Sequence, residues 1–240
     1  MFYRLPRIFC VALAVIGAPV TASTVVLWPV DPVIANGETA TGVWVENKGK
    51  EPVTLQIRSL GWSQTDGQDH FRNQNEVVVS PPIATVAAGQ RQLVRIIRRT
   101  PGSTGSAERS YRLLIDEIPP AFNPAKPGEA TAQLGVQMRY SIPLFTYDGA
   151  AAAAVPDLHA RIELTNEKRF LVISNSGDRH ARLLDLRTVS GTRSTAIVSG
   201  LVGYVLPGQT ARFELPGNIP SVSGFQVNVN GVDQSLAPST

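Results

Sequence analysis

The chain has 240 residues, of which 43% are hydrophobic and 17% are charged, a balance typical of a folded globular protein and not of a disordered or coiled-coil chain. Its 22 lysine and arginine residues nearly balance its 19 acidic residues, which argues against a nucleic-acid-binding protein and against a binder of anionic membranes. The 20 glycines and 18 prolines favour a protein with many turns over a bundle of helices.

Residues 1–22 have the pattern of a cleavable export signal. Arg4 and Arg7 precede the apolar run 8–16, and cleavage is expected after Ala22. The run is shorter than the roughly 18 apolar residues that a membrane-spanning helix needs, so we expect no stable membrane insertion. Cys10, the only cysteine, lies inside this signal. The exported chain is therefore expected to lack disulfides, thiol chemistry and cysteine-based metal sites.

Residues 23–147 show the rhythm of an all-β domain, in which short β-branched or alternating runs are separated by turn residues. The predicted strands are Ser23–Trp28 with Val33–Ala35, Ala40–Glu46, Val53–Leu60, Glu76–Val79 with Ile83–Val86, Arg91–Arg98, Tyr111–Ile118 and Ala132–Phe145. Turn signals lie between them, among them Asn36-Gly37, Asn47-Lys48-Gly49 and Asp66-Gly67. This many short strands predicts a two-layer β-sandwich.

Residues 148–156 interrupt the pattern. A run of alanines stands between Gly149 and Pro156, and it is too short for a stable helix, so we interpret it as a linker. The β rhythm then resumes over 157–240, with predicted strands Arg161–Leu164, Arg169–Ser174, Ala181–Val189, Thr195–Leu201, Thr210–Glu214 and Gly224–Val229, and with 236–240 as a frayed tail. The sequence thus predicts an all-β protein of two sandwich domains.

The residues that could carry catalysis are scattered. His70, His159 and His180 each fall in a turn-rich stretch without a second ligand at metal-binding spacing, and we expect them on the surface. Asp116 and Glu117 are neighbours in a predicted strand, so their side chains point to opposite faces and cannot share one site. We therefore expect no enzyme activity, no metal site and no cofactor.

The most unusual segment is the long alternating run 132–145. One face carries the apolar residues Leu134, Val136, Met138, Tyr140, Ile142 and Leu144. At about 3.3 Å per residue this strand would span roughly 45 Å, much more than a typical strand. Pro143 favours an edge position, because proline cannot donate a hydrogen bond to a neighbouring strand. Two interpretations stay open: the apolar face packs on its own core, or the edge strand lends its side chains to another protein.

A set of motifs recurs along the chain in a characteristic order and spacing: Ser80-Pro81-Pro82, Ala88-Gly89, Leu93-Val94-Arg95-Ile96, the segment from Tyr111 to Pro120, the strand from Gln137 to Phe145, Asn175-Ser176-Gly177 and Leu206-Pro207-Gly208. In these motifs the chain resembles the periplasmic chaperones of the chaperone–usher pathway, which assemble bacterial pili and fimbriae. The run from Met138 to Pro143 is more similar to the archaic branch, which builds fimbriae of the spore-coat-protein-U type.

This resemblance implies two immunoglobulin-like domains arranged as an L or boomerang. It implies a periplasmic chaperone that binds and folds pilus subunits by donor-strand complementation, without ATP, and delivers them to an outer-membrane usher. The donated side chains would be Leu134, Val136 and Met138, with Tyr140 and Ile142.

The chain departs from the better-known branch at the site that anchors the subunit's C-terminal carboxylate. The two cationic positions of the family fall here on Asp31 or Pro32 and on Pro143, and none of these can bind an anion. Our hypothesis is that Arg112, or as second choice Arg139, replaces them. Glu117 matches an acidic residue that helps to fix the angle between the domains in the family, although the position of its usual basic partner falls near Tyr147.

A secreted β-sandwich adhesin or a fimbrial structural subunit is the alternative. Such a subunit would need an extended N-terminal donor arm, whereas Ser23–Trp28 is followed at once by Asp31-Pro32 and regular strands. A carbohydrate-binding module is disfavoured because Trp28, Trp44 and Trp62 fall in strands where they are expected to be at least partly buried.

Overall fold

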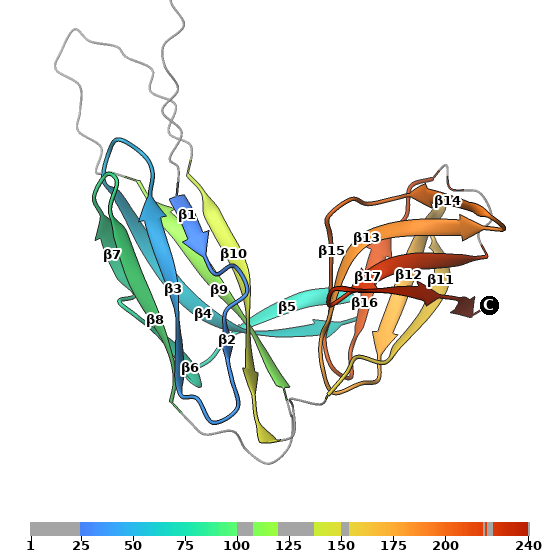
Figure 1. The fold of residues 1–240 in the computed structure, drawn as a ribbon, viewed down its shortest axis with the longest axis horizontal. Helices are drawn as coiled ribbons and strands as arrows, with labels where there is room; N and C mark the ends of the chain where they lie inside the picture. Colours follow the sequence, from blue (N-terminus) through green and yellow to red (C-terminus); the bar gives the residue numbers. More distant parts are fainter. Residues whose placement is uncertain are drawn as a thin grey trace, which may run out of the picture.

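The computed structural model describes residues 25–99, 108–119, 137–149, 154–217, 219 and 223–239. Its elements are strands, β1 to β19, and Figure 1 shows them gathered into two lobes that stand side by side and diverge toward the top of the view. The predicted all-β fold class is confirmed. The expected signal peptide lies outside the described residues.

The first lobe is a sandwich of two sheets. The first sheet has the order β1 (Val25–Trp28), β3 (Ala40–Asn47), β8 (Arg91–Arg98), β6 (Val77–Ser80). The second sheet has the order β2 (Val33–Ile34), β10 (Arg139–Tyr147), β9 (Glu108–Ile118), β4 (Val53–Thr65), β5 (Gln68–Asn73), and β7 (Ile83–Val86) also pairs with β4. Inward-facing side chains such as Val43, Ile96, Leu113 and Leu144 meet between the sheets as its core.

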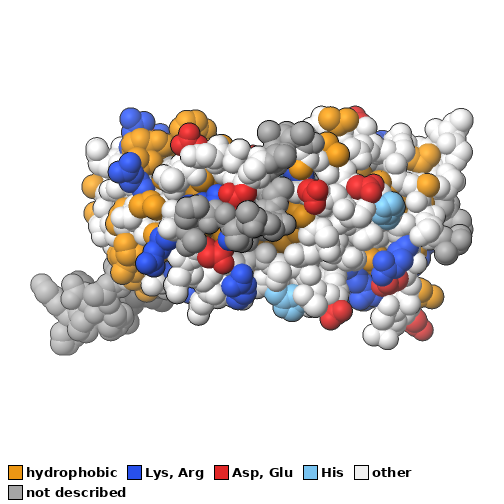
Figure 2. Space-filling view, turned by 90° about the horizontal axis from the view of Figure 1, so that it is seen from below, with side chains coloured by type: hydrophobic (Ala, Val, Ile, Leu, Met, Phe, Trp, Pro, Cys, Tyr) orange, Lys and Arg blue, Asp and Glu red, His pale blue; other side chains and the backbone are white. Residues whose placement is uncertain are grey.

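The second lobe is built in the same way. One sheet has the order β16 (Thr210–Glu214), β12 (Lys168–Asn175), β11 (Leu158–Thr165), β19 (Pro238–Ser239). The other has the order β14 (Arg193–Ala196), β13 (Ala181–Ser190), β17 (Gly224–Val229), β18 (Val232–Leu236), and β15 (Leu201–Val205) also pairs with β13. Figure 2, which shows the molecule from below, has basic and acidic side chains interspersed over both lobes.

Several segments differ from the prediction. The strands β15 and β18 were not predicted, and the predicted strand Thr195–Leu201 is not continuous, since β14 ends at Ala196 and β15 begins at Leu201. The strand β5 was missed because every residue in it is exposed, so that no apolar alternation marks it in the sequence. The expectation of a frayed tail at 236–240 is wrong for its described part, since Leu236 is buried in the second core and β19 pairs with β11. The strand β19 is fixed by its pairing with the distant strand β11, which a local pattern does not reveal, whereas β5 is fixed by its hairpin with the neighbouring β4.

The same turn motif occurs once in each lobe. It is built on an asparagine that is followed two residues later by glycine. The Asn47 amide donates to the backbone oxygen of Val86, at 3.0 Å, and the Asn175 amide donates to that of Val205, at 3.1 Å. In each case the asparagine Oδ1 accepts from the N–H of the glycine. Both side chains are 1% exposed. Each asparagine therefore satisfies backbone groups that its loop would otherwise bury unpaired.

The hairpin of β4 and β5 joins the lobes. It projects from the first lobe to the second in Figure 1. At its tip the backbone oxygen of Gly67 accepts a hydrogen bond from the N–H of Arg212, at 3.1 Å, and Gly67 forms a bridge with Ala211. The turn requires glycine for two reasons: its φ is +76°, and a Cβ there would lie 2.6 Å from the Cβ of Arg212.

Gly67→Ala is therefore expected to destabilise the protein more than Gly37→Ala. Gly37 shares a positive φ, +83°, but has nothing within 4 Å of its would-be Cβ. Both variants bear the roughly 1–2 kcal/mol cost of a left-handed backbone, and only Gly67→Ala adds a clash, of about 1–3 kcal/mol. Urea unfolding of both variants measures the difference. Equal losses would mean that the hairpin is not docked on the second lobe in solution.

Candidate interdomain and donor-strand site

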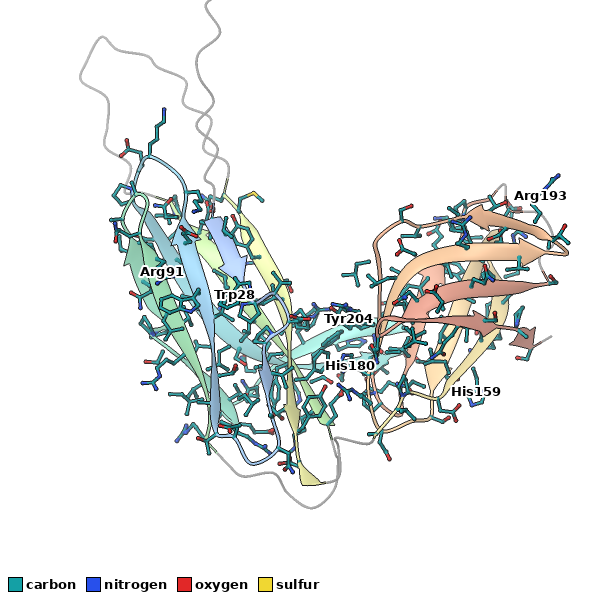
Figure 3. The ribbon with its side chains drawn as sticks, in the orientation of Figure 1. Trp28, Arg91, His159, His180, Arg193 and Tyr204 are labelled. Carbon is teal, nitrogen blue, oxygen red and sulfur yellow. The ribbon has the colours of Figure 1, made fainter. Side chains whose placement is uncertain are left out.

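An aromatic cluster fills the junction between the lobes. Trp62, Phe145 and Tyr147 from the first lobe are buried against Tyr204 and Leu206 from the second. The Phe145 ring is stacked on the His180 ring, with centroids 3.6 Å apart and planes 2° from parallel. Figure 3 shows His180 and Tyr204 between the two lobes. The junction is thus packed like a protein core, which favours a fixed angle between the domains.

Polar contacts lock the same junction. The side-chain amide of Gln64 donates to the backbone oxygen of Tyr204 and accepts from the backbone N–H of Leu206, each at 2.9 Å. The backbone N–H of Gln64 donates to the side-chain oxygen of Gln209. The strand β4 continues four residues beyond Gly61, where its pairing with β9 ends, and this extension brings Gln64 to the second lobe.

Glu108 makes the second polar lock. Its side chain is fully buried, and one carboxylate oxygen lies 2.8 Å from Nδ1 of His180. Both carboxylate oxygens also accept from the backbone N–H of His180, at 3.2 Å each. The expectation that His180 lies on the surface is wrong, since only 12% of its side chain is exposed. The His180 ring is buried by its stack on Phe145, a contact that no sequence pattern indicates.

Glu117, the residue predicted to help set the interdomain angle, lies toward the opposite end of β9 from Glu108. It accepts a hydrogen bond from the Tyr140 hydroxyl of its own lobe, at 3.2 Å. The acid that lies at the junction on β9 is Glu108, which stands at the start of the strand, nine residues before Glu117. That Glu117 helps to set the interdomain angle stays a prediction.

The five predicted donor residues fall into different surroundings. Leu134 and Val136 lie outside the described residues. Met138 is 42% exposed, just before β10 begins. Tyr140 is partly buried, and Ile142 is 8% exposed and packs in the core of the first lobe. In this state Ile142 is occupied by its own domain, so Met138 is the described member of the set that is open to a partner.

Arg139, one of the two candidate anchors, lies on the outer face of β10. Its side chain is 64% exposed and forms an ion pair with Asp116, which also accepts from Arg58 at 2.7 Å. Burial opposes ionisation of Asp116, but the bonds from Arg139 and Arg58 outweigh it, so the pKa of this carboxyl lies below its usual value. Arg139 is thus engaged within its own sheet.

Arg112, the other candidate, lies directly opposite Pro143 in the pairing of β9 with β10. Its guanidinium carbon lies 3.8 Å from the centre of the Trp62 ring and 5.3 Å from that of Tyr204. Asp69 is its acidic neighbour, at 4.0 Å. A pocket of about 430 Å³ between the lobes is lined by Arg112, Asp69 and Tyr204. A cation therefore faces a cleft beside the end of the candidate donor strand.

The donors around Arg112 are not all satisfied. Burial lowers the pKa of Arg112, while the nearby Asp69 acts in the opposite direction, and a guanidinium stays charged in proteins. In the described part of the chain, Nε of Arg112 and Nε1 of Trp62 are buried without a hydrogen-bond partner. Of these two residues only Arg112 lines the pocket between the lobes, and a guanidinium donor suits an oxygen acceptor such as a carboxylate. The sequence did not point to Trp62 or Asp69, because the register of β4, β5 and β9 is needed to bring them to Arg112.

Trp28 differs from its expected environment. It was expected to be at least partly buried, but 67% of it is exposed on β1, close to the exposed Val26 and Val30. The described residues contain no group of three or more side chains that could hold a metal ion, and no helix in them is long and apolar enough to span a membrane.

Comparison with known proteins gives a consistent result. A family model described as pili and flagellar-assembly chaperone, PapD N-terminal domain, matches residues 25–147. The structure of the CsuC–CsuE chaperone–tip adhesion subunit pre-assembly complex, from archaic chaperone–usher Csu pili of Acinetobacter baumannii, contains a chain that is 28% identical, with 90% of this chain and 100% of that chain covered and a TM-score of 0.71.

Two further structures show the same fold. A chain of the Salmonella enterica SafA pilin–SafB chaperone complex is 20% identical, with 89% of this chain and 96% of that chain covered and a TM-score of 0.61. The Pseudomonas aeruginosa CupB2 chaperone is 16% identical, with 89% and 100% covered and a TM-score of 0.57. A comparison with curated proteins finds no match.

The family model covers just over half of the chain, and the solved structures extend the likeness across both lobes. The two lobes are accordingly immunoglobulin-like domains. On this evidence the chain belongs to the family of pili and flagellar-assembly chaperones.

Proposed function

We propose that this protein is a periplasmic chaperone that binds and folds pilus subunits by donating its 134–142 strand, and that it hands them to an outer-membrane usher without using ATP. The observation that carries the proposal is the outer edge of β10. Among the described strands, this edge is covered only at Phe145 and Thr146, by β2, while Met138 stands exposed at its start. Open edges that carry apolar side chains are the sites at which proteins add a strand from a partner.

The complexes among the similar structures support this proposal. Both the CsuC–CsuE and the SafB–SafA structures pair a chaperone with the protein that it assembles, a tip adhesion subunit and a pilin. By analogy, the domains would be a signal peptide at 1–22, a donor-bearing domain at 23–147, a linker at 148–156 and a second domain at 157–240. Family and fold are those of a chaperone without catalytic activity.

The test is co-expression in a bacterial periplasm with a candidate pilus subunit encoded next to this chain. Because a subunit that lacks a strand exposes its core, it should aggregate or be degraded alone and become soluble with the chaperone. A one-to-one complex on size-exclusion chromatography is the expected result. If the subunit is equally soluble without the chaperone, the proposal is wrong.

We further propose that Arg112 holds the C-terminal carboxylate of the subunit, with Arg139 as the second candidate. The cleft position of Arg112, next to the end of the donor strand, supports this assignment. Since hydrogen bonds to charged groups contribute about 1.5–3 kcal/mol, Arg112→Ala should weaken subunit binding by about 10- to 100-fold.

Arg58→Ala is the matched control, because Arg58 lies on the same sheet and pairs with Asp116 rather than facing the cleft pocket. Isothermal titration or competition binding with the purified subunit would compare the two variants and Arg139→Ala. Unchanged affinity in Arg112→Ala, with a loss in Arg139→Ala, would move the anchor to Arg139.

The alternative of a secreted adhesin or structural subunit is not favoured, because the family model that matches residues 25–147 is that of an assembly chaperone.

A further inference from the structure

Along the open edge of β10, the backbone N–H groups that could bind a partner strand stop at Pro143. Donation of the strand does not by itself require this. We propose that Pro143 is a register stop: it ends the backbone ladder that a subunit strand can form along β10, so that the last β10 residue able to donate to that strand is Ser141. This inference rests on the proposed function and specifies how the partner strand is positioned.

The argument begins with the direction in which each backbone group of β10 points. The backbone oxygen of Met138 accepts from the N–H of Glu117, at 3.0 Å, so the backbone groups of Met138 face toward β9. In a strand, these groups alternate between the two edges from one residue to the next. Those of Tyr140, Ile142 and Leu144 therefore also face β9, and those of Arg139, Ser141 and Pro143 face the opposite edge.

An independent contact confirms this alternation. The N–H of Phe145 donates to the backbone oxygen of Pro32, at 3.4 Å, just before β2. Since Phe145 is two residues beyond Pro143, the nitrogen of Pro143 faces the same side as β2. Pro143 thus breaks no bond in the ladder between β9 and β10, which explains why proline is tolerated inside this strand.

The cost of the proline falls instead on an incoming strand. Arg139 and Ser141 each offer an N–H and a backbone oxygen at the open edge, whereas Pro143 offers only an oxygen, and its ring occupies the place of the N–H. Two residues further on, Phe145 and Thr146 are already paired with β2. Among the described residues, a subunit strand therefore finds complete pairing at Arg139 and Ser141 and none beyond them.

This stop lies where the position of the subunit must be defined. The position of Pro143 is the one at which the resemblance places a cation in the better-known branch, and proline cannot bind an anion. A strand that ends at Pro143 would place its terminus at the part of β10 whose cross-strand neighbour on β9 is Arg112. A backbone stop can thus set the register where a charged anchor on the donor strand is missing.

The test uses the co-expressed subunit and three variants. Ser141→Pro moves the stop two residues back while sparing the ladder to β9, and Ser141→Ala is its control. At the upper end of its range, one backbone hydrogen bond changes a binding constant by about a factor of ten, and the proline ring would also clash with the incoming strand. Ser141→Pro should therefore weaken subunit binding by about ten-fold or more. Ser141→Ala should bind as the native chain does. Thermal unfolding checks that both variants are folded.

Pro143→Val restores the missing donor and should let the subunit strand slide. With one cysteine at Ser141 and single cysteines along the subunit strand, disulfide trapping reads the register, since the chain has no cysteine apart from Cys10. The native chain should trap one subunit position, and Pro143→Val should trap a second, two residues away.

Equal binding by Ser141→Pro and Ser141→Ala, or a single unchanged trapping position in Pro143→Val, would overturn the register stop and leave the chaperone function intact. A native chain that binds no subunit would instead remove the proposed function, and the register stop with it.

Discussion

Replacing Glu108 with alanine is expected to lower the free energy of unfolding by about 2–6 kcal/mol, because each of two buried donors of His180 loses its acceptor, at about 1–3 kcal/mol each. The Glu108 carboxylate is fully buried and accepts from Nδ1 and from the backbone N–H of His180. In the variant the His180 donors would lose this acceptor while the Phe145 ring still covers them. The contact between the two domains should weaken as well, because Glu108 belongs to the first domain and His180 to the second.

Glu108→Gln is the matched control, because it keeps the shape and one acceptor oxygen and removes only the charge. Its loss should be clearly smaller than that of Glu108→Ala. Urea unfolding followed by tryptophan fluorescence measures the loss, since one of the three tryptophans, Trp62, lies at the junction. A loss of less than about 0.5 kcal/mol in Glu108→Ala would show that this pair does not hold the domains together.

The fold could be predicted largely from turn residues and alternation. Strands such as Arg91–Arg98 and Thr210–Glu214 were predicted with their observed bounds, because an apolar period of two between turn signals has few other interpretations. The strands β5, β18 and β19 were missed. All of β5 and the first four residues of β18 are exposed, so neither shows an apolar alternation, and β19 has only two residues. The pairing of β19 depends on where β11 lies, which no local pattern encodes.

The site was only partly predictable. The apolar alternation singled out Met138, but it also included Ile142, which the domain uses for its own core. Alternation shows that residues share a face, and it does not show where that face leaves the domain. The junction residues Gln64, Glu108 and His180 carry no common sequence signal, because they come from distant strands and loops and meet only in the folded chain.

The second large effect is expected at the donor strand itself. Each large apolar side chain that is buried in a subunit groove contributes about 1.5–3 kcal/mol, so Val136 and Met138 together would account for roughly 3–6 kcal/mol. Val136→Asp/Met138→Asp also places two carboxylates in an apolar groove, where unpaired charges are strongly disfavoured. The dissociation constant of the subunit complex should therefore rise by at least about 100-fold.

Gln133→Asp/Gln137→Asp is the matched control for this variant. It adds the same two charges to the same segment, but at positions of the opposite face by the alternation of the sequence. It should retain subunit binding within a few-fold of the native chain. Comparing the two double variants shows whether binding is lost because the charges lie on the donated apolar face or merely because negative charge was added to the segment.

The most direct test of the account is therefore co-purification of the subunit with three chains: the native chaperone, Val136→Asp/Met138→Asp and Gln133→Asp/Gln137→Asp. We predict a soluble complex with the first and third chains and none with the second, while circular dichroism shows the second chain to be folded. A complex of equal yield with the folded Val136→Asp/Met138→Asp chain would contradict strand donation through these residues.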